Sequence, residues 1–91
     1  MITLSAKLVF HIPHAHSLKD KRQVRRSIIE KTKHRFNVSI AEVDTQESWQ
    51  TLSIGIAVVS GEMHHAKESL DEIVRFMEEH TDGELVLIEE E

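Results

Sequence analysis

Two hydrophobic periodicities alternate along this chain, and their order limits the folds that it can adopt. Between residues 2 and 12, apolar side chains occupy every second position, which is typical of a strand with one buried face. From Ser17 onward the spacing becomes helical, with an apolar stripe formed by Leu18, Val24, Ile28, Ile29, Thr32 and Phe36. The chain therefore begins with a predicted strand followed by a predicted helix.

The remaining residues repeat both periodicities. Strands are predicted over 37–44 and 50–60, an amphipathic helix over 62–80, and a short strand from Glu84 before an acidic tail at 89–91. Right-handed crossovers in the order β-α-β-β-α-β place both helices on one face of a four-stranded antiparallel sheet. The sequence thus predicts a single α+β domain over residues 1–91 with a ferredoxin-like plait.

Positive charge is concentrated on the first helix. Residues 17–36 contain eight of the eleven Lys and Arg residues against two acids, which is a net +6, whereas the other 71 residues carry a net −11. The whole chain is net −5, which argues against diffuse nucleic-acid binding. The segregation of charge, however, indicates a binding surface on this helix.

Composition and motifs exclude several classes of protein. The chain has no cysteine, so thiol catalysis and cysteine-based zinc sites are excluded. We find no signal peptide, no apolar run that could span a membrane, no cofactor motif and no element that reads DNA sequence. Acylphosphatases share the plait, but their glycine-rich, arginine-bearing loop is replaced by "HIPHAHSLKDKR". With no nucleophile and base to pair, we expect a soluble, cytoplasmic protein that is not an enzyme.

The open face of the predicted sheet lacks the side chains of an RNA-recognition motif, which stacks bases on aromatic residues. Its third strand offers only small residues there, namely Thr51, Ser53, Gly55 and Ala57. Such a flat face either stays exposed or stacks on a second copy of the chain, because small residues allow close approach. A homodimer or higher oligomer is therefore one alternative.

Two further features have a structural and a functional interpretation. The cluster of His11, His14 and His16 is the metal candidate, since imidazoles bind transition metals, but solvated loop histidines are the favoured interpretation. Trp49 lies in the loop before the third strand. It is expected to cover the open end of the small core, and the alternative is an exposed anchor for a partner.

Two basic residues fall within the apolar stripe of the helix. From Phe36 back to Arg25 is roughly 16 Å of helix, and from Asn37 on to Glu42 is roughly 16 Å of strand. Glu42 also shares the inward parity of Val38 and Ile40. We therefore predict an ion pair between Arg25 and Glu42 at the edge of the core, with Lys21 as the alternative cation.

The other basic residues form a flank beside the stripe. Phosphate or RNA contact is predicted for Lys19, Lys21, Arg22, Arg26 and Lys33. Cations in the first turn oppose the helix dipole, so a sequence selected for stability alone would place acids there. Basic groups beside free N–H donors suit an anion such as phosphate. The alternative is neutralisation by the acids of the second helix or by the acidic surface of a neighbouring subunit.

The chain also resembles a known family. The stretch "IPHAHSLKDKRQVRRSIIEKTKHRFNVSIAEVD", then Trp49-Gln50 and "SIGIAVVS", is similar to the YlxP-like family, small bacterial domains of unknown function. The resemblance covers nearly the whole chain and implies a ferredoxin-like fold. It supplies no catalytic residues. Because such proteins are often encoded near translation and ribosome-maturation genes, it also implies an RNA or ribosomal partner. Our leading hypothesis is a non-enzymatic RNA-binding or ribosome-associated domain, and the alternative is a self-associating module.

Overall fold

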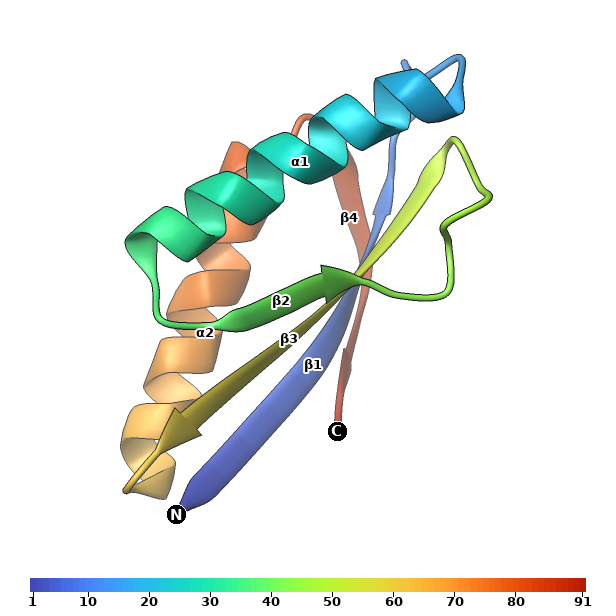
Figure 1. Cartoon of the computed structure of the whole chain (residues 1–91). Helices are drawn as coiled ribbons and strands as arrows, with labels where there is room; N and C mark the ends of the chain where they lie inside the picture. The colour runs from blue at the N-terminus through green and yellow to red at the C-terminus, as the bar shows by residue number, and fades with distance from the viewer.

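The computed structural model describes all 91 residues. The chain folds in the order β1 (Ile2–His11), α1 (Leu18–Arg35), β2 (Ser39–Glu42), β3 (Thr51–Ser60), α2 (Met63–His80) and β4 (Glu84–Glu90). The strands form one sheet in the order β2-β3-β1-β4, and every neighbouring pair is antiparallel. Both helices lie on the same face of this sheet (Figure 1). The predicted ferredoxin-like plait is therefore confirmed.

The core lies between the sheet and the two helices. The alternating apolar residues of the strands form the side of the core that belongs to the sheet. Alternate side chains of β1 and β3 are buried from Ala6 to Phe10 and from Leu52 to Val58. The helices cover them with Val24 and Ile28 from α1 and with Leu70, Ile73 and Met77 from α2. Burial of these apolar side chains is the main force that holds the two layers together.

The loop between β2 and β3 covers part of the sheet face that the helices leave open. Asp44 adopts a left-handed backbone conformation, with φ of 67°, which asparagine and aspartate tolerate better than most residues. The hydroxyl of Thr45 then accepts a 2.9 Å hydrogen bond from the backbone N–H of Ser53. Ser53 is buried, although its parity places it on the open face.

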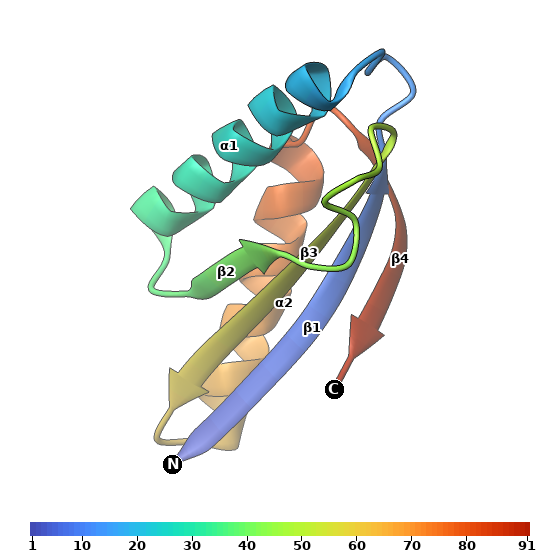
Figure 2. The ribbon, with the colours of Figure 1, turned by 45° about the vertical axis from the view of Figure 1, so that its right-hand side comes forward.

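This loop also contacts the connection from β1 to α1. The backbone N–H of Ile12 donates to the Gln50 carbonyl at 2.9 Å, and the Gln50 side chain donates to the carbonyl of Ala15 at 3.1 Å. Figure 2 shows the two loops side by side at the end of the molecule where α1 begins. The loop that carries Trp49 and the start of α1 therefore belong to one region of the surface.

The last strand is longer than the sequence predicted. Glu89 and Glu90 were expected in a solvated tail, but they pair with Lys7 and Ala6 of β1. The backbone N–H of Glu91 continues the ladder by donating to the Ser5 carbonyl at 3.0 Å. Their side chains remain exposed, which explains why the acidic composition suggested a tail.

Candidate nucleic-acid interface

The first turn of α1 is capped by Ser17. The Ser17 hydroxyl accepts a 3.1 Å hydrogen bond from the Asp20 N–H, and the Asp20 carboxylate accepts one of 2.9 Å from the His16 N–H. The Asp20 carboxylate therefore lies in the first turn and binds the backbone just before the N-cap. An acid thus complements the helix dipole at the start of α1, beside the predicted phosphate contacts.

A buried network of charges connects α1 to the end of β2. Lys21 has no exposed surface, and its Nζ lies 2.7 Å from Oε2 of Glu42. The same ammonium group donates to the Thr45 carbonyl. Nη1 of Arg25 lies 3.2 Å from Oε1 of Glu42, which is within the ion-pair distance expected from the sequence. The Thr45 hydroxyl donates to Oε2 at 2.9 Å and completes the set.

The network holds the Glu42 carboxylate in its ionised form. Burial by itself disfavours the charged carboxylate and would raise its pKa. Hydrogen bonds from Lys21, Thr45 and Arg25, together with the charge of Lys21, outweigh burial and lower the pKa of Glu42 below its ordinary value. The carboxylate is therefore a structural anion that ties the helix, the strand and the following loop together.

The position of Lys21 removes it from the phosphate candidates. Its side chain is fully buried and directed at Glu42 and Thr45, so it offers no charge to an external ligand. The prediction that Lys21 contacts phosphate is therefore wrong. The physical reason is that Lys21 faces the sheet within the apolar stripe, where the loop after β2 covers it.

Four exposed cations remain on one side of α1, and we call them the basic flank: Lys19, Arg22, Arg26 and Lys33. No member of the basic flank takes part in any ion pair of the protein. No ion pair joins α1 to α2 either, so the acids of the second helix do not neutralise the first within one chain. The flank lies beside Arg25 on the helix surface, and Arg25 contacts β2, so the flank adjoins the β2 edge.

Trp49 does not cover the core as expected. Its side chain is 48% exposed, and it is absent from the core cluster. The loop that carries it is tied to the start of α1 by Gln50 and by the contact of Thr45 with Lys21. The exposed indole thus belongs to the same end of the molecule as Lys19 and Arg22.

The histidine cluster does not form a metal site. No group of three His, Asp or Glu side chains in the protein has a geometry that could hold a metal ion. His11, His14 and His16 are each exposed, at the end of β1 and in the connection to α1. Farther away, His64 lies 2.9 Å from Glu68, an exposed pair along one face of α2.

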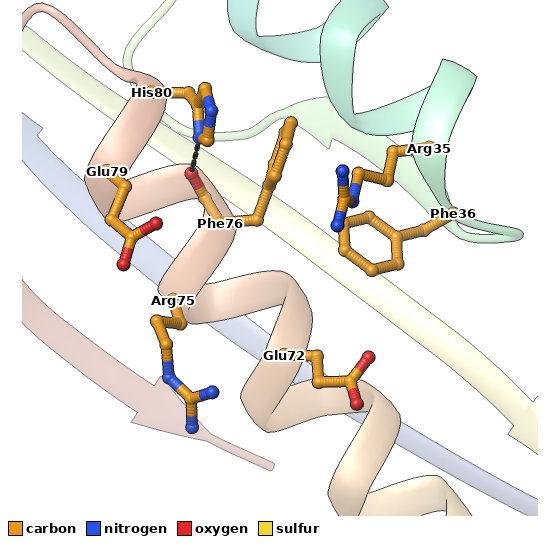
Figure 3. A pocket seen from close by; sticks show the side chains of 7 residues that line it. All are labelled: Arg35, Phe36, Glu72, Arg75, Phe76, Glu79 and His80. Carbon is orange, nitrogen blue, oxygen red and sulfur yellow. Dashed lines mark hydrogen bonds between the residues drawn. The ribbon is translucent and has the colours of Figure 1, made fainter.

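The structure adds one cluster that the sequence analysis did not identify. Where the two helices meet, the Phe36 and Phe76 rings pack edge to face with centroids 5.3 Å apart, and His80 stacks on Phe76 at 4.1 Å. The guanidinium of Arg35 lies 5.5 Å from the centroid of Phe76 (Figure 3). The i, i+4 spacing of Phe76 and His80 was a usable signal for the stack.

The fold and the exposed surface together define the class: a ferredoxin-like α+β domain with an unpaired basic flank on its first helix. The chain belongs to the family "Protein of unknown function (DUF503)", whose model matches residues 3–90. It is 39% identical over 64 residues to the uncharacterized protein YlxP of Bacillus subtilis (strain 168), and the match covers 70% of each chain.

A solved structure shares the fold. The solution NMR structure of a de novo designed protein with a ferredoxin fold matches with a TM-score of 0.60, covering 94% of this chain and 82% of the designed one. The two sequences are 16% identical, so the likeness concerns the fold alone. No helix of the protein is both long enough and apolar enough to cross a membrane.

Proposed function

We propose that this domain is a non-enzymatic RNA-binding protein of the cytoplasm that contacts RNA phosphates through the basic flank. The observation that carries the proposal is that four exposed cations on one helix side neutralise no acid of their own chain. Because the whole chain has a net charge of −5, its composition alone does not account for a row of unpaired cations. Unpaired cations arranged in a row are typical of a surface that binds a phosphate backbone.

The length of the basic flank suits several phosphates. Lys19 and Lys33 are fourteen residues apart in α1, which corresponds to roughly 21 Å along the helix axis. Cations spread over such a length can follow one strand of RNA, whose phosphates carry no sequence information but fix orientation. Four contacts predict a salt dependence of log K against log[salt] with a slope of about −2.8 to −3.6.

The exposed indole of Trp49 supplies a second kind of contact. Unpaired RNA bases stack on aromatic side chains, and one stacked base contributes about 1–3 kcal/mol of binding. Since Trp49 lies at the end of the molecule where α1 begins, a strand along the basic flank would bring a base to the indole. The proposed ligand is therefore single-stranded or looped RNA, and the translation context of the family makes ribosomal RNA the first RNA to test.

A charge-matched pair of variants tests the proposal. The double variant Lys19→Gln/Arg22→Gln removes two flank charges, whereas Lys31→Gln/Lys67→Gln removes two exposed charges elsewhere and leaves the same net charge. Affinity for a single-stranded RNA is measured by fluorescence anisotropy over a series of salt concentrations. The flank variant should bind more weakly with a slope smaller in magnitude by about 1.4–1.8, and the control should match the wild type.

Two results would overturn the proposal. Equal losses in both double variants would show that RNA responds to net charge and not to the basic flank. Wild-type protein that binds no RNA at low salt would remove RNA as the partner altogether.

A further inference from the structure

The outer edge of β4 is an open strand edge. β4 pairs only with β1, so it ends the sheet on the side away from β2 (Figure 2). The backbone N–H of Glu91 donates to the Ser5 carbonyl and therefore points toward β1. Successive residues of an antiparallel pair direct their backbone groups to opposite sides, so those of Glu90 and Ile88 point away from β1. Each of these two residues offers one donor and one acceptor to a further strand.

A groove of about 290 Å³ lies beside this edge, between β4 and α2. Its apolar lining comes from Ile88 of β4 and Val74 of α2. Ile88 is the register partner of the buried Leu8, so its side chain lies on the helical side of the sheet. It nevertheless stays 43% exposed, because no further strand covers its outer side. An apolar side chain opposite Ile88 on an added strand would therefore pack against the groove lining.

The polar lining of the groove is mostly acidic. Asp71 and Glu78 of α2 and Glu90 of β4 face a single cation, Arg75. None of these four side chains takes part in an ion pair of the protein. Glu90 lies two positions after Ile88 and therefore faces the same side of the sheet. A side chain opposite Glu90 on an added strand would meet uncompensated carboxylates, which favour a Lys or an Arg there.

Glutamates at both ends of β4 oppose its pairing with a second copy of itself. Full-length antiparallel pairing of two β4 strands centres on Leu87 and places Glu84 opposite Glu90 at each end. Like charges directly opposite each other destabilise a strand pair, and charged residues commonly protect sheet edges in this way. The run from Leu85 to Ile88 between these acids carries no charge. The same edge therefore suits a strand whose apolar residues are flanked by cations.

We infer that the β4 edge binds an extended, basic segment of another protein as an added strand. An apolar residue of that segment lies opposite Ile88, and a Lys or Arg two positions away lies opposite Glu90. Hydrogen bonds to the backbone of β4 supply affinity for any extended chain, and the groove selects the apolar and the basic side chain. The inference does not depend on RNA binding, because the basic flank adjoins the β2 edge at the other side of the sheet.

Amide hydrogen exchange measured by NMR with a synthetic peptide tests the inference. The probe is the capped peptide Lys-Lys-Val-Thr-Val-Val-Lys at millimolar concentration, and the control peptide carries Glu in place of each Lys. The Lys peptide should slow exchange at the Ile88 and Glu90 amides, because their N–H groups become hydrogen-bonded. The Glu89 amide already faces β1 and should change less. The Glu peptide should protect neither Ile88 nor Glu90, because its charges repel the groove acids.

A charge-matched pair of variants tests the role of the groove acids. Asp71→Asn/Glu90→Gln removes two charges from the groove, whereas Glu30→Gln/Glu47→Gln removes two exposed charges elsewhere. Both variants should keep the circular dichroism of the wild type. The groove variant should bind the Lys peptide about 2- to 30-fold more weakly, as expected for the loss of two exposed ion pairs. The control variant should bind it as the wild type does.

Unchanged exchange at Ile88 and Glu90 in the presence of the Lys peptide would overturn the inference, because the edge would then take no strand. Equal affinity for the two peptides, or equal losses in the two double variants, would overturn the assignment of a basic partner. Exchange at these amides that slows when the protein alone is concentrated would also overturn it, and would assign the edge to a second copy of the chain.

Discussion

Lys21 and Glu42, one on the first helix and one at the end of the second strand, form the most deeply buried ion pair of the protein, with Nζ 2.7 Å from Oε2. Both side chains are almost fully enclosed, at 0% and 4% exposed, whereas Arg25 on the other carboxylate oxygen keeps 30% of its surface. Removing one charge of such a pair destabilises the fold strongly, because it leaves the other charge unpaired in the interior. The two cations should therefore contribute unequally to stability.

Replacing Lys21 should destabilise the protein far more than replacing Arg25. Lys21→Met leaves the Glu42 charge buried with one cation, and we expect a loss of roughly 3 kcal/mol of unfolding free energy. Arg25→Met, at a partly exposed position, should cost about 1 kcal/mol or less. Urea denaturation of both variants checks the order. Equal losses, or a larger loss for Arg25→Met, would contradict it.

The same pair provides a double-mutant cycle. If the cost of Lys21→Met comes from an uncompensated carboxylate, then Lys21→Met/Glu42→Met should be more stable than the sum of the two single losses predicts. Apolar groups of similar length can replace a buried ion pair with little net loss. Strictly additive losses would show that the two side chains stabilise the fold independently.

The lowered pKa of Glu42 predicts an acid-sensitive contribution to stability. The pKa of this carboxyl is lower in the folded chain than in the unfolded chain, so the unfolded state takes up a proton first as pH falls. The contribution is therefore complete above the ordinary pKa of 4.5 and is lost as pH falls through the lower, folded value. Urea midpoints should fall below this pH in the wild type, and the fall should be shallower in Glu42→Gln. Parallel pH curves for the two proteins would count against this role.

The sequence predicts the parts of this network whose positions depend on helix and strand lengths, and not the parts that depend on the path of a loop. Helix rise and strand rise are fixed, so counting back from Phe36 and forward from Asn37 placed Arg25 level with Glu42. The path of the loop after β2 has no such periodicity. Thr45 covers Lys21 and Trp49 stays exposed because of turns that begin at Asp44, and no repeat in the sequence encodes them. The fold and both cations were therefore predictable, Lys21 as the alternative to Arg25, but the simultaneous pairing of the two with Glu42 and the contact of Lys21 with Thr45 were not.

The basic flank gives a stability prediction that separates its two interpretations. Lys19 and Arg22 lie in the first turns of α1, where cations oppose the helix dipole, and neither has an acidic partner. Lys19→Gln/Arg22→Gln should leave the urea midpoint unchanged or raise stability by a few tenths of a kcal/mol up to ~1. A clear destabilisation of the monomeric protein would instead mean that these cations neutralise acids of their own fold.

Trp49 offers a direct optical test of RNA contact, because it is the only tryptophan of the chain and its emission reports on the indole alone. Since the indole is half exposed, stacking of a base should quench its emission as single-stranded RNA is added, with the same midpoint as the anisotropy titration. Trp49→Ala should weaken binding by about 1–3 kcal/mol. Trp49→Phe should cause only part of that loss, because phenylalanine still stacks on a base. Neither substitution removes a charge, so the salt slope should stay at the wild-type value. Quenching that is absent at saturating RNA, together with full affinity in Trp49→Ala, would place the bound RNA on the basic flank away from this loop.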